Sequence, residues 1–262
     1  MDFLAQINPL YSLSGLAVGI LVGMTGVGGG SLMTPLLILL FGIHPAAAVG
    51  TDLLYAAATK TGGTFFHGFA KTVDWRVVGR LAAGSIPATL VTLFVLIRMD
   101  IRGSGAQNII TLMLGFALLI TAVALAFNKQ VLAAYAARVG DLSPQRTVVI
   151  TIVVGAVLGV LVSVTSVGAG ALGVTALIAL YPRYPLARIV GSDIAHAVPL
   201  TLLAGLGHWM MGSVDWLLLA SLLVGSLPGI LIGSYAAGRV PESVLRLILA
   251  ATLLLVGFRL IL

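Results

Sequence analysis

Ionisable side chains lie inside stretches of the sequence that are otherwise apolar. Lys60 falls about 14 residues into the segment 46–66, and Asp52 precedes it by eight residues, roughly on the same face of a helix. In the second half of the chain, His196 follows Asp193 at position i+3, again on one helical face. Ionisable groups are costly at such depth in hydrocarbon and mark substrate or ion pathways. We therefore expect Lys60 to bind substrate and Asp52, Asp193 and His196 to couple protons or ions.

The same residues have less specific interpretations. Lys60 would snorkel to an interface if it lay near a helix end, but its distance from both ends favours a cavity or a carboxylate partner such as Asp52. Asp52 and Asp193 follow Gly-Thr and Gly-Ser pairs, so helix capping is an equally good interpretation of both. His67 and His208 precede polar turns close to tryptophans, and we expect both at the membrane interface.

The sequence contains an internal duplication. Residues 23–30 (GMTGVGGG) align with residues 163–170 (SVTSVGAG) at an offset of 140, and after one inserted residue 49–52 (VGTD) aligns with 190–193 (VGSD). The later offset also pairs the two Val-Asp-Trp sequences and the Gly-Ser-Ile-Pro and Gly-Ser-Leu-Pro sequences. Such self-similarity is typical of transporters built from repeated halves. We expect a first transmembrane repeat over 1–127, a polar cytoplasmic linker over 128–146 and a second repeat over 147–262.

The elements that must position these residues are apolar helices. Hydrophobic residues make up 60% of the chain and charged residues 8%, against about 25% charged in soluble domains. Each half contains five apolar segments, the first two of them short and separated by a glycine-rich break: 10–24, 30–41, 46–66, 76–97 and 106–127, then 147–162, 171–181, 187–207, 216–237 and 243–262. The fold class predicted is an all-α polytopic membrane protein of about eight to ten membrane segments.

Basic residues discriminate between topologies of the short pair. A single broken crossing would divide the lysines and arginines of the loops seven against six, which specifies no orientation. A hairpin that returns to its own side places ten on one side and three on the other, which is a usable positive-inside signal. With a hairpin, or with two full crossings, each half crosses the membrane an odd number of times. We therefore expect inverted repeats with broken or re-entrant helices, and both termini outside the plasma membrane.

The two glycine-rich breaks are the expected substrate site. Non-helical backbone in hydrocarbon needs polar partners, and the helix that follows each break begins with unpaired N–H groups that attract anions. Close helix packing is the alternative explanation of these glycines, but two equivalent breaks favour a midplane site. The substrate-binding residues predicted are Thr25, Gly26, Val27, Gly28, Gly29, Gly30, Ser31, Thr51, Lys60, Thr165, Ser166, Val167, Gly168, Ala169, Gly170 and Ser192.

Composition excludes several other function classes. The chain has no cysteine, so it has no disulfide or thiolate chemistry. The basic residues behind its net charge of +6 form no basic stripe, so nucleic acid is not an expected partner. The expected partners are a small anion and the lipid bilayer. A homo-oligomer is also possible from the sequence. A membrane metal enzyme is a weak rival, because the histidines lack metal-ligand spacing and the single glutamate, Glu242, lies in a loop. We expect no cofactor, no metal and no catalytic residue. A passive anion channel is not separable from a transporter by sequence.

The combination of motifs carries a resemblance. Gly23 to Gly30 followed by Thr-Pro-Leu at 34–36, Ala-Val-Gly-Thr at 48–51, Val-Asp-Trp at 73–75 and Gly-Ser-Ile-Pro at 84–87 make the chain similar to the sulfite exporter TauE/SafE family of membrane permeases. The resemblance covers nearly the whole chain. It implies a secondary transporter of the plasma membrane that moves small sulfur-containing anions, sulfite first among them, or thiosulfate, sulfonates or related organic acids. Alternating access about the broken helices is the mechanism expected of such a fold.

Overall fold

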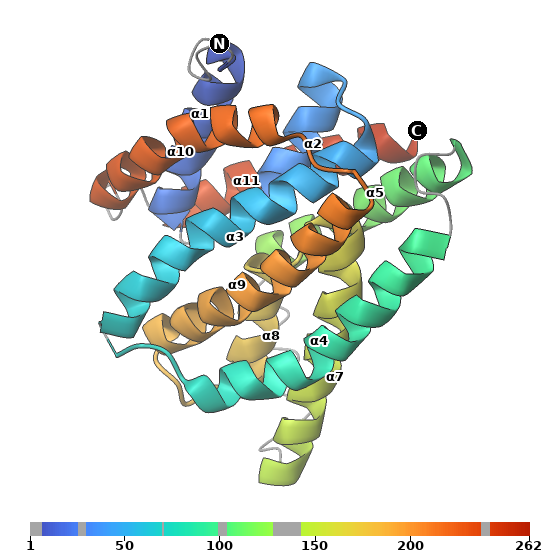
Figure 1. Ribbon diagram of the computed structural model, residues 1–262. Coiled ribbons are helices and arrows are strands. Elements are labelled where there is room, and N and C mark those ends of the chain that lie inside the picture. Colours follow the sequence, from blue (N-terminus) through green and yellow to red (C-terminus); the bar gives the residue numbers. More distant parts are fainter. Residues whose placement is uncertain (1–6, 26–29, 70, 99–103, 128–142, 237–241) are drawn as a thin grey trace.

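The computed structural model describes residues 7–25, 30–69, 71–98, 104–127, 143–236 and 242–262. Within these ranges the chain is helical, as predicted, and has no strand (Figure 1). The first half contains α1 (Pro9–Thr25), α2 (Gly30–Phe41), α3 (Pro45–Phe69), α4 (Trp75–Arg98) and α5 (Ser104–Ala126). The second half contains α7 (Pro144–Thr165), α8 (Ala171–Leu180), α9 (Leu186–Met210), α10 (Trp216–Ala236) and α11 (Glu242–Ile261).

The first two helices of each half form a hairpin. Near the start of α1, the ring of Tyr11 meets the ring of Phe41 at the end of α2, with centroids 4.8 Å apart. In the second half the Thr151 hydroxyl, early in α7, lies 2.9 Å from the hydroxyl of Tyr181, directly after α8. Because the far ends of both helices meet, the chain returns to the side from which it came. This geometry excludes the single broken crossing.

The helix boundaries correct one prediction. The sequence predicts a short segment over 147–162 and a break from Thr165, but α7 has 22 residues and Thr165 is its last. Pro144 at the first helical position and the Ser143 hydroxyl, which accepts the N–H of Arg146, start the helix earlier. Ser166 ends it, because this residue takes a left-handed conformation with φ of 59°. The second break therefore spans residues 166–170.

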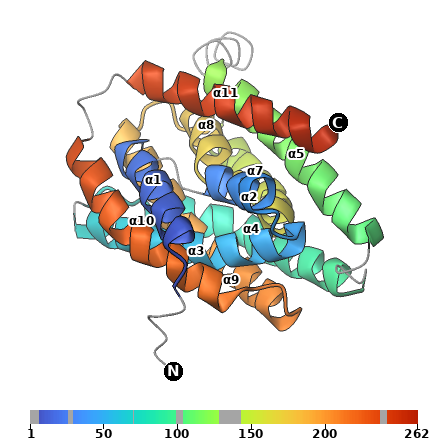
Figure 2. The same ribbon diagram turned by 90° about the horizontal axis from the view of Figure 1, so that it is seen from above.

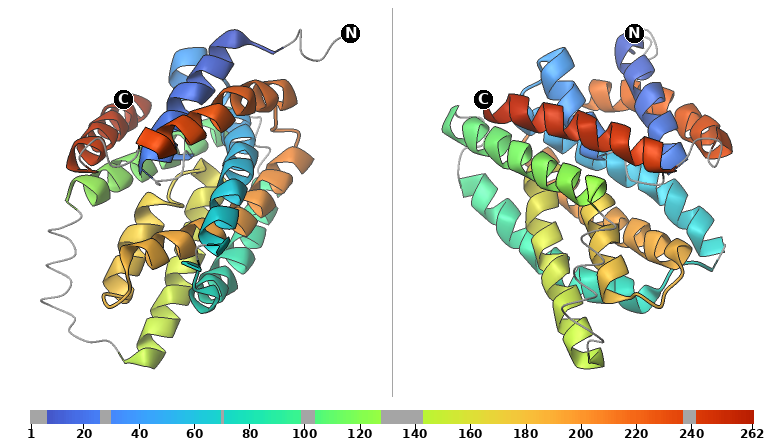
Figure 3. Two further views of the ribbon diagram at one scale, coloured as in Figure 1. Left: turned by 90° about the vertical axis from the view of Figure 1, so that its left-hand side faces the viewer. Right: turned by 180° about the vertical axis from the view of Figure 1, so that it is seen from behind.

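Helices of one half pack mainly on helices of the other. α1 packs against α10 and α4 against α7, while α3 pairs with α9 and α5 with α11. Figure 2 shows α1 lying across α10, and Figure 3 shows α5 beside α11 along one face of the bundle. Exchanging each helix for its counterpart in the duplicated sequence leaves this set of pairs unchanged. The two halves therefore make the same contacts.

Glycines allow two of these interfaces to close backbone against backbone. A Cβ at Gly155 of α7 would collide with the carbonyl oxygen of Leu81 in α4, and one at Gly15 of α1 would collide with that of Leu222 in α10. Leu81 and Leu222 are equivalent in the duplication, as are Gly15 and Gly155. Small residues at helix crossings are typical of bundles in lipid, where close van der Waals contact holds helices together.

The outer and inner surfaces of the bundle agree with a lipid environment. Among the described residues, four helical stretches are long and apolar enough to cross a membrane by length and composition: α4, α7, α9 and residues 216–233 of α10. Large apolar side chains are exposed along them, including Phe94, Val157 and Leu231. Helices α3 and α9 lie side by side at the centre (Figure 1), and most of their residues are buried. Their polar residues are therefore the ones that line the interior.

Candidate functional site

Two acids and one lysine lie at the centre of the bundle. Asp52 and Lys60 belong to α3 and Asp193 to α9, and their exposed fractions are 0%, 5% and 1%. Each aspartate is the eighth residue of its helix, so the capping interpretation is wrong for both. The electrostatic neighbours of the Lys60 ammonium are Asp193 and, to a smaller extent, Asp52. The structure thus brings together three of the residues predicted for binding and coupling.

Lys60 reaches the broken helix of the opposite half. Its Nζ donates a hydrogen bond of 3.0 Å to the carbonyl oxygen of Ala169, in the break between α7 and α8. Three residues in this break have a positive φ, which interrupts the helix: Ser166 at 59°, Gly168 at 118° and Gly170 at 120°. A glycine reaches such angles without the steric cost that a Cβ brings. Lys60 and the second break therefore lie together, and their part in substrate binding stays a prediction.

The start of α8 supplies unpaired backbone donors to this site. The first hydrogen bonds of the helix run from the N–H of Gly173 to the carbonyl of Gly168 and from the N–H of Val174 to that of Gly170. The N–H groups of Ala171 and Leu172 precede this bonded turn. Such groups carry partial positive charge and bind anions.

Asp193 lies against this helix start. A Cβ at Gly173 would collide with its Oδ1, so the carboxyl group packs directly on the glycine backbone. Both carboxyl oxygens are buried and have no hydrogen-bond partner among the described residues. The Gly170 N–H and the Lys60 ammonium are its favourable electrostatic neighbours.

Asp52 has a different environment. The hydroxyl of Thr34, in α2, donates a hydrogen bond of 2.5 Å to Asp52 Oδ2. The Ser166 hydroxyl also lies near this carboxyl group, although neither Ser166 Oγ nor Asp52 Oδ1 makes a hydrogen bond of good geometry. A carboxylate partner such as Asp52 was one of the two environments expected for Lys60, but the Lys60 ammonium bonds to the Ala169 carbonyl.

His196 lies one helical turn beyond Asp193, in the same buried region. Its Nε2 is 2.8 Å from the hydroxyl of Ser85 in α4, while its Nδ1 has no partner in the described part of the chain. In the duplicated sequence Tyr55 occupies the position of His196, and Ser226 that of Ser85. Tyr55 and Ser226 are also neighbours, and both are buried with unpaired hydroxyls. The duplication thus gives two equivalent polar pairs, each made of one residue from either half, and only one of the pairs contains a histidine.

The remaining predicted binding residues are placed as follows. Residues 26–29, which include Gly26, Val27, Gly28 and Gly29, lie outside the described residues, as do the side chains of Thr25 and Ser31; Gly30 is the first residue of α2. Val167 is buried in a hydrophobic cluster with residues of α5 and α11, such as Leu118 and Leu253.

The predicted binding hydroxyls of Thr51, Ser192 and Thr165 are each used by the backbone. Thr51 accepts the N–H of Asp215, and Ser192 accepts that of Asp74. Thr165 accepts the N–H of Val167 within the break. Their part in substrate binding stays a prediction.

One histidine contradicts its predicted location. The sequence places His208 at the interface, but its exposed fraction is 0% and its Nε2 lies 2.9 Å from the carbonyl oxygen of Ser163. The hydrogen bond satisfies a backbone group near the second break, which explains the burial. The side chain of His67, its counterpart, lies outside the described residues. Thr34, Ser85 and Tyr55 also face the site and were missed, because single hydroxyl residues are common in membrane helices.

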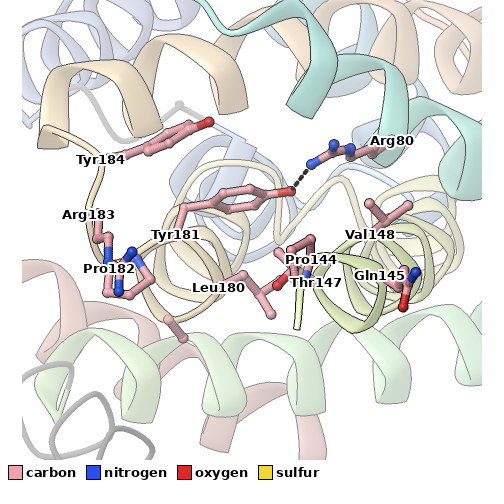
Figure 4. A pocket seen from close by; sticks show the side chains of 11 residues that line it. Arg80, Pro144, Gln145, Thr147, Val148, Leu180, Tyr181, Pro182, Arg183 and Tyr184 are labelled. Carbon is pink, nitrogen blue, oxygen red and sulfur yellow. Dashed lines mark hydrogen bonds between the residues drawn. The ribbon is translucent and has the colours of Figure 1, made fainter. Parts of the chain in front are cut away.

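A cavity of about 660 Å³ opens at the far end of the second hairpin (Figure 4). The start of α7 and the end of α8 line it, with Arg80 of α4 donating to the hydroxyl of Tyr181 over 3.1 Å. Leu180, which lines it, is separated from Gly170 by the length of α8, about 15 Å at 1.5 Å per residue. The cavity is therefore distinct from the Lys60 site.

An ion pair lies at the same end of the molecule, between the loop before α4 and the start of α9. Arg188 Nη2 donates to Asp74 Oδ2 over 2.8 Å, and Asp74 Oδ1 accepts the N–H groups of Arg76 and Val77 as the N-cap of α4. Burial alone would raise the pKa of Asp74, but these N–H groups and the Arg188 charge outweigh it and lower that pKa below its ordinary value. Burial and the nearby Asp74 charge raise the pKa of Tyr184.

The arrangement can bind an anion and exchange protons. It combines one buried cation, unpaired helix N–H groups, two carboxyl groups and an imidazole. No group of three or more metal-ligating side chains occurs among the described residues. Several unpaired buried polar atoms around Lys60 indicate that the working site holds a polar partner.

The known proteins that this chain resembles are described as exporters or membrane transporters. The family model described as Sulfite exporter TauE/SafE matches residues 11–260. A probable membrane transporter protein of Bacillus subtilis, YjnA, is 41% identical over 95% of this chain and 98% of its own length. A second from that organism, YdhB, is 26% identical over 87% of the chain and 90% of its own length, and one from Xylella fastidiosa is 29% identical over 88% and 85%. No solved structure matches the chain.

Proposed function

The chain belongs to the sulfite exporter TauE/SafE family of membrane transporters, and on that premise we propose that it is a secondary transporter of a small sulfur-containing anion. Sulfite is the first candidate substrate, with thiosulfate and sulfonates next. The proposal places the protein in the plasma membrane with both termini outside.

One observation carries the proposal. The Lys60 ammonium, 5% exposed, bonds to the backbone of a helix break whose next helix opens with unpaired N–H groups. A buried positive charge beside a helix N-terminus favours an oxyanion, which accepts hydrogen bonds from both. A neutral substrate would gain hydrogen bonds from these donors but no charge attraction, and a cationic substrate would be repelled.

Proton coupling follows from a count of charges. Lys60 contributes one positive charge, and Asp52 and Asp193 contribute two negative charges when both are ionised. An added anion would then leave excess negative charge in a buried site, which is strongly unfavourable. An anion that enters with a proton avoids this cost. The proposed transporter therefore couples anion movement to protons through Asp52, Asp193 or His196.

We further propose that the halves are inverted repeats which give alternating access to this site. Each half has a hairpin followed by three more helices, so the chain changes sides between halves. α1 begins at the top of Figure 1 and α7 at the bottom, in line with opposite orientations. The ten-to-three division of basic residues supports the same topology. Transporters of this class bind substrate where discontinuous helices meet.

The test is anion flux into proteoliposomes. Sulfite, thiosulfate and methanesulfonate uptake would be measured with and without a pH gradient for the wild type and Lys60→Ala, with Lys71→Ala as the control. The control also removes one lysine charge, but Lys71 is exposed in the loop after α3. We expect gradient-driven flux for at least one anion, its loss in Lys60→Ala and its retention in Lys71→Ala.

The outcomes separate the proposal from its rivals. No flux with any of the three anions would refute the substrate class. Rapid flux that ignores the pH gradient would instead identify a passive anion channel.

A further inference from the structure

The two buried aspartates are equivalent in the duplicated sequence but differ in their hydrogen bonds. Asp52 accepts the Thr34 hydroxyl over 2.5 Å and lies near the Ser166 hydroxyl. Asp193 has no hydroxyl donor among the described residues, and both of its oxygens are unpaired there. A donated hydrogen bond stabilises the carboxylate form of Asp52. Asp52 is therefore held in place by a hydroxyl hydrogen bond, whereas Asp193 is not.

Asp193 also occupies the place where an anion would bind. Its Oδ1 packs on Gly173, in the first turn of α8, where a Cβ would collide with it. The N–H of Gly170 and the ammonium of Lys60 are its favourable neighbours. The Lys60 ammonium is one of the donors assigned to the proposed substrate, and the Gly170 N–H directly precedes the others, those of Ala171 and Leu172. An ionised Asp193 is thus an internal competitor for the same positive charge.

We propose that Asp193 is the group whose proton is exchanged during transport, and that its carboxylate competes with the substrate anion for Lys60 and the start of α8. Asp52 is the fixed counter-charge of Lys60. The assignment rests on the proposed anion transport and adds to it which acid couples and why. A proton on Asp193 neutralises the competitor, so that anion and proton bind together.

The charges balance through one cycle. With Asp193 ionised the cluster of Lys60, Asp52 and Asp193 has a net charge of −1 and excludes an anion. A proton from one side binds Asp193 and brings the cluster to zero; a monoanion such as methanesulfonate then brings it to −1, and the thiosulfate dianion brings it to −2. Release of both on the other side restores the starting state, so a monoanion and its proton move without net charge, whereas thiosulfate and its proton move one negative charge.

Few other ionisable groups of the described chain face Asp193. Lys60 faces it from α3, with Asp52 behind it, and His196 follows it on α9. Helices α4, α7 and α8 also pack against α9, and α8 presents the backbone of Gly173 to the carboxyl group. His196 bonds to Ser85 through Nε2. It is placed to pass a proton along α9 rather than to meet the anion.

The test is the pH dependence of thiosulfate binding to the detergent-purified protein, since the charge of this anion is constant from about pH 5 to 8. One exchanged proton makes the apparent Kd of the wild type rise about tenfold per pH unit on the alkaline limb. Asp193→Asn, which mimics the protonated acid, should bind thiosulfate with the same Kd across the range. Asp52→Asn should keep the tenfold slope and shift it to lower pH, because removing the negative charge of Asp52 leaves the positive charge of Lys60 to Asp193 and favours its carboxylate form.

A second measurement needs no variant. Thiosulfate added to weakly buffered wild-type protein should take up about one proton for each anion bound on the alkaline limb. A tenfold slope that persists in Asp193→Asn, or binding without proton uptake, would overturn the assignment while leaving anion transport intact. No flux of any tested anion by the wild type would overturn the proposed function and this assignment with it.

Discussion

Substituting Gly84 by alanine tests the close interface between α4 and α7. The new Cβ would collide with the carbonyl oxygen of Ile152 and lie 2.7 Å from the backbone nitrogen of Ala156. Neither atom can rotate away, so the helices must separate. Overpacking of this kind costs about 1–3 kcal/mol. Gly79, in the same helix, serves as the control, because a Cβ added there would have no neighbouring atom within 4 Å.

The comparison of the two variants isolates the packing cost. Both replace a helical glycine by alanine, so the gain in helix propensity of about 1 kcal/mol is common to them. Gly84→Ala should therefore be about 1–3 kcal/mol less stable than Gly79→Ala, a difference in Tm of roughly 2–12 °C at about 2–4 °C per kcal/mol. Thermal unfolding in detergent, followed by tryptophan fluorescence or circular dichroism, measures it. Equal Tm values would refute backbone contact at Gly84.

Three further predictions concern polar contacts. Asp74→Ala should destabilise the protein by about 1 kcal/mol through loss of the N-cap. Because the folded-state pKa of Asp74 is lowered, the difference in stability from the wild type should be complete above about pH 5 and should vanish as the pH falls below about 4. Unfolding measured at each pH tests this. His208→Ala should cost about 1–3 kcal/mol by leaving the Ser163 carbonyl unpaired, and a chemical unfolding curve unchanged from wild type would contradict its burial. Thr34→Val should weaken the distinction between the two acids, so that the alkaline limb of thiosulfate binding shifts in pH relative to wild type; an identical curve would exclude the Thr34 bond as its cause.

The sequence predicts the helices well because their signals are local. Apolar segments, glycine breaks and the duplication placed nearly every helix within a few residues, and the depth of Lys60 in its segment correctly indicated burial. The same local signals misplaced the start of α7, where Pro144 and a serine cap extend the helix into sequence that looks polar. The predicted break likewise included Thr165, which remains helical because the left-handed turn comes one residue later.

Sequence patterns could not predict the contacts between the two halves. Nothing in the spacing of one chain states that Lys60 bonds to Ala169, 109 residues away, or that His208 bonds to the Ser163 carbonyl. His208 looked like an interface residue because tryptophans surround it in sequence. It is buried because it satisfies a backbone group of another helix. Long-range pairing of this kind depends on the three-dimensional fold alone.

The glycine interfaces have a consequence for the origin of the chain. The contact of Gly15 with Leu222 and the contact of Gly155 with Leu81 are one contact made twice, each time between different halves. A chain of half this length would contain both the glycine face and the leucine face of this contact, and neither face would have its partner. Two copies in opposite orientations would satisfy both faces reciprocally, as in an isologous dimer. Fusion of two such copies would account for a contact that is made twice, and Lys60 and His196 are each present in only one of the halves, opposite Thr201 and Tyr55 in the duplication.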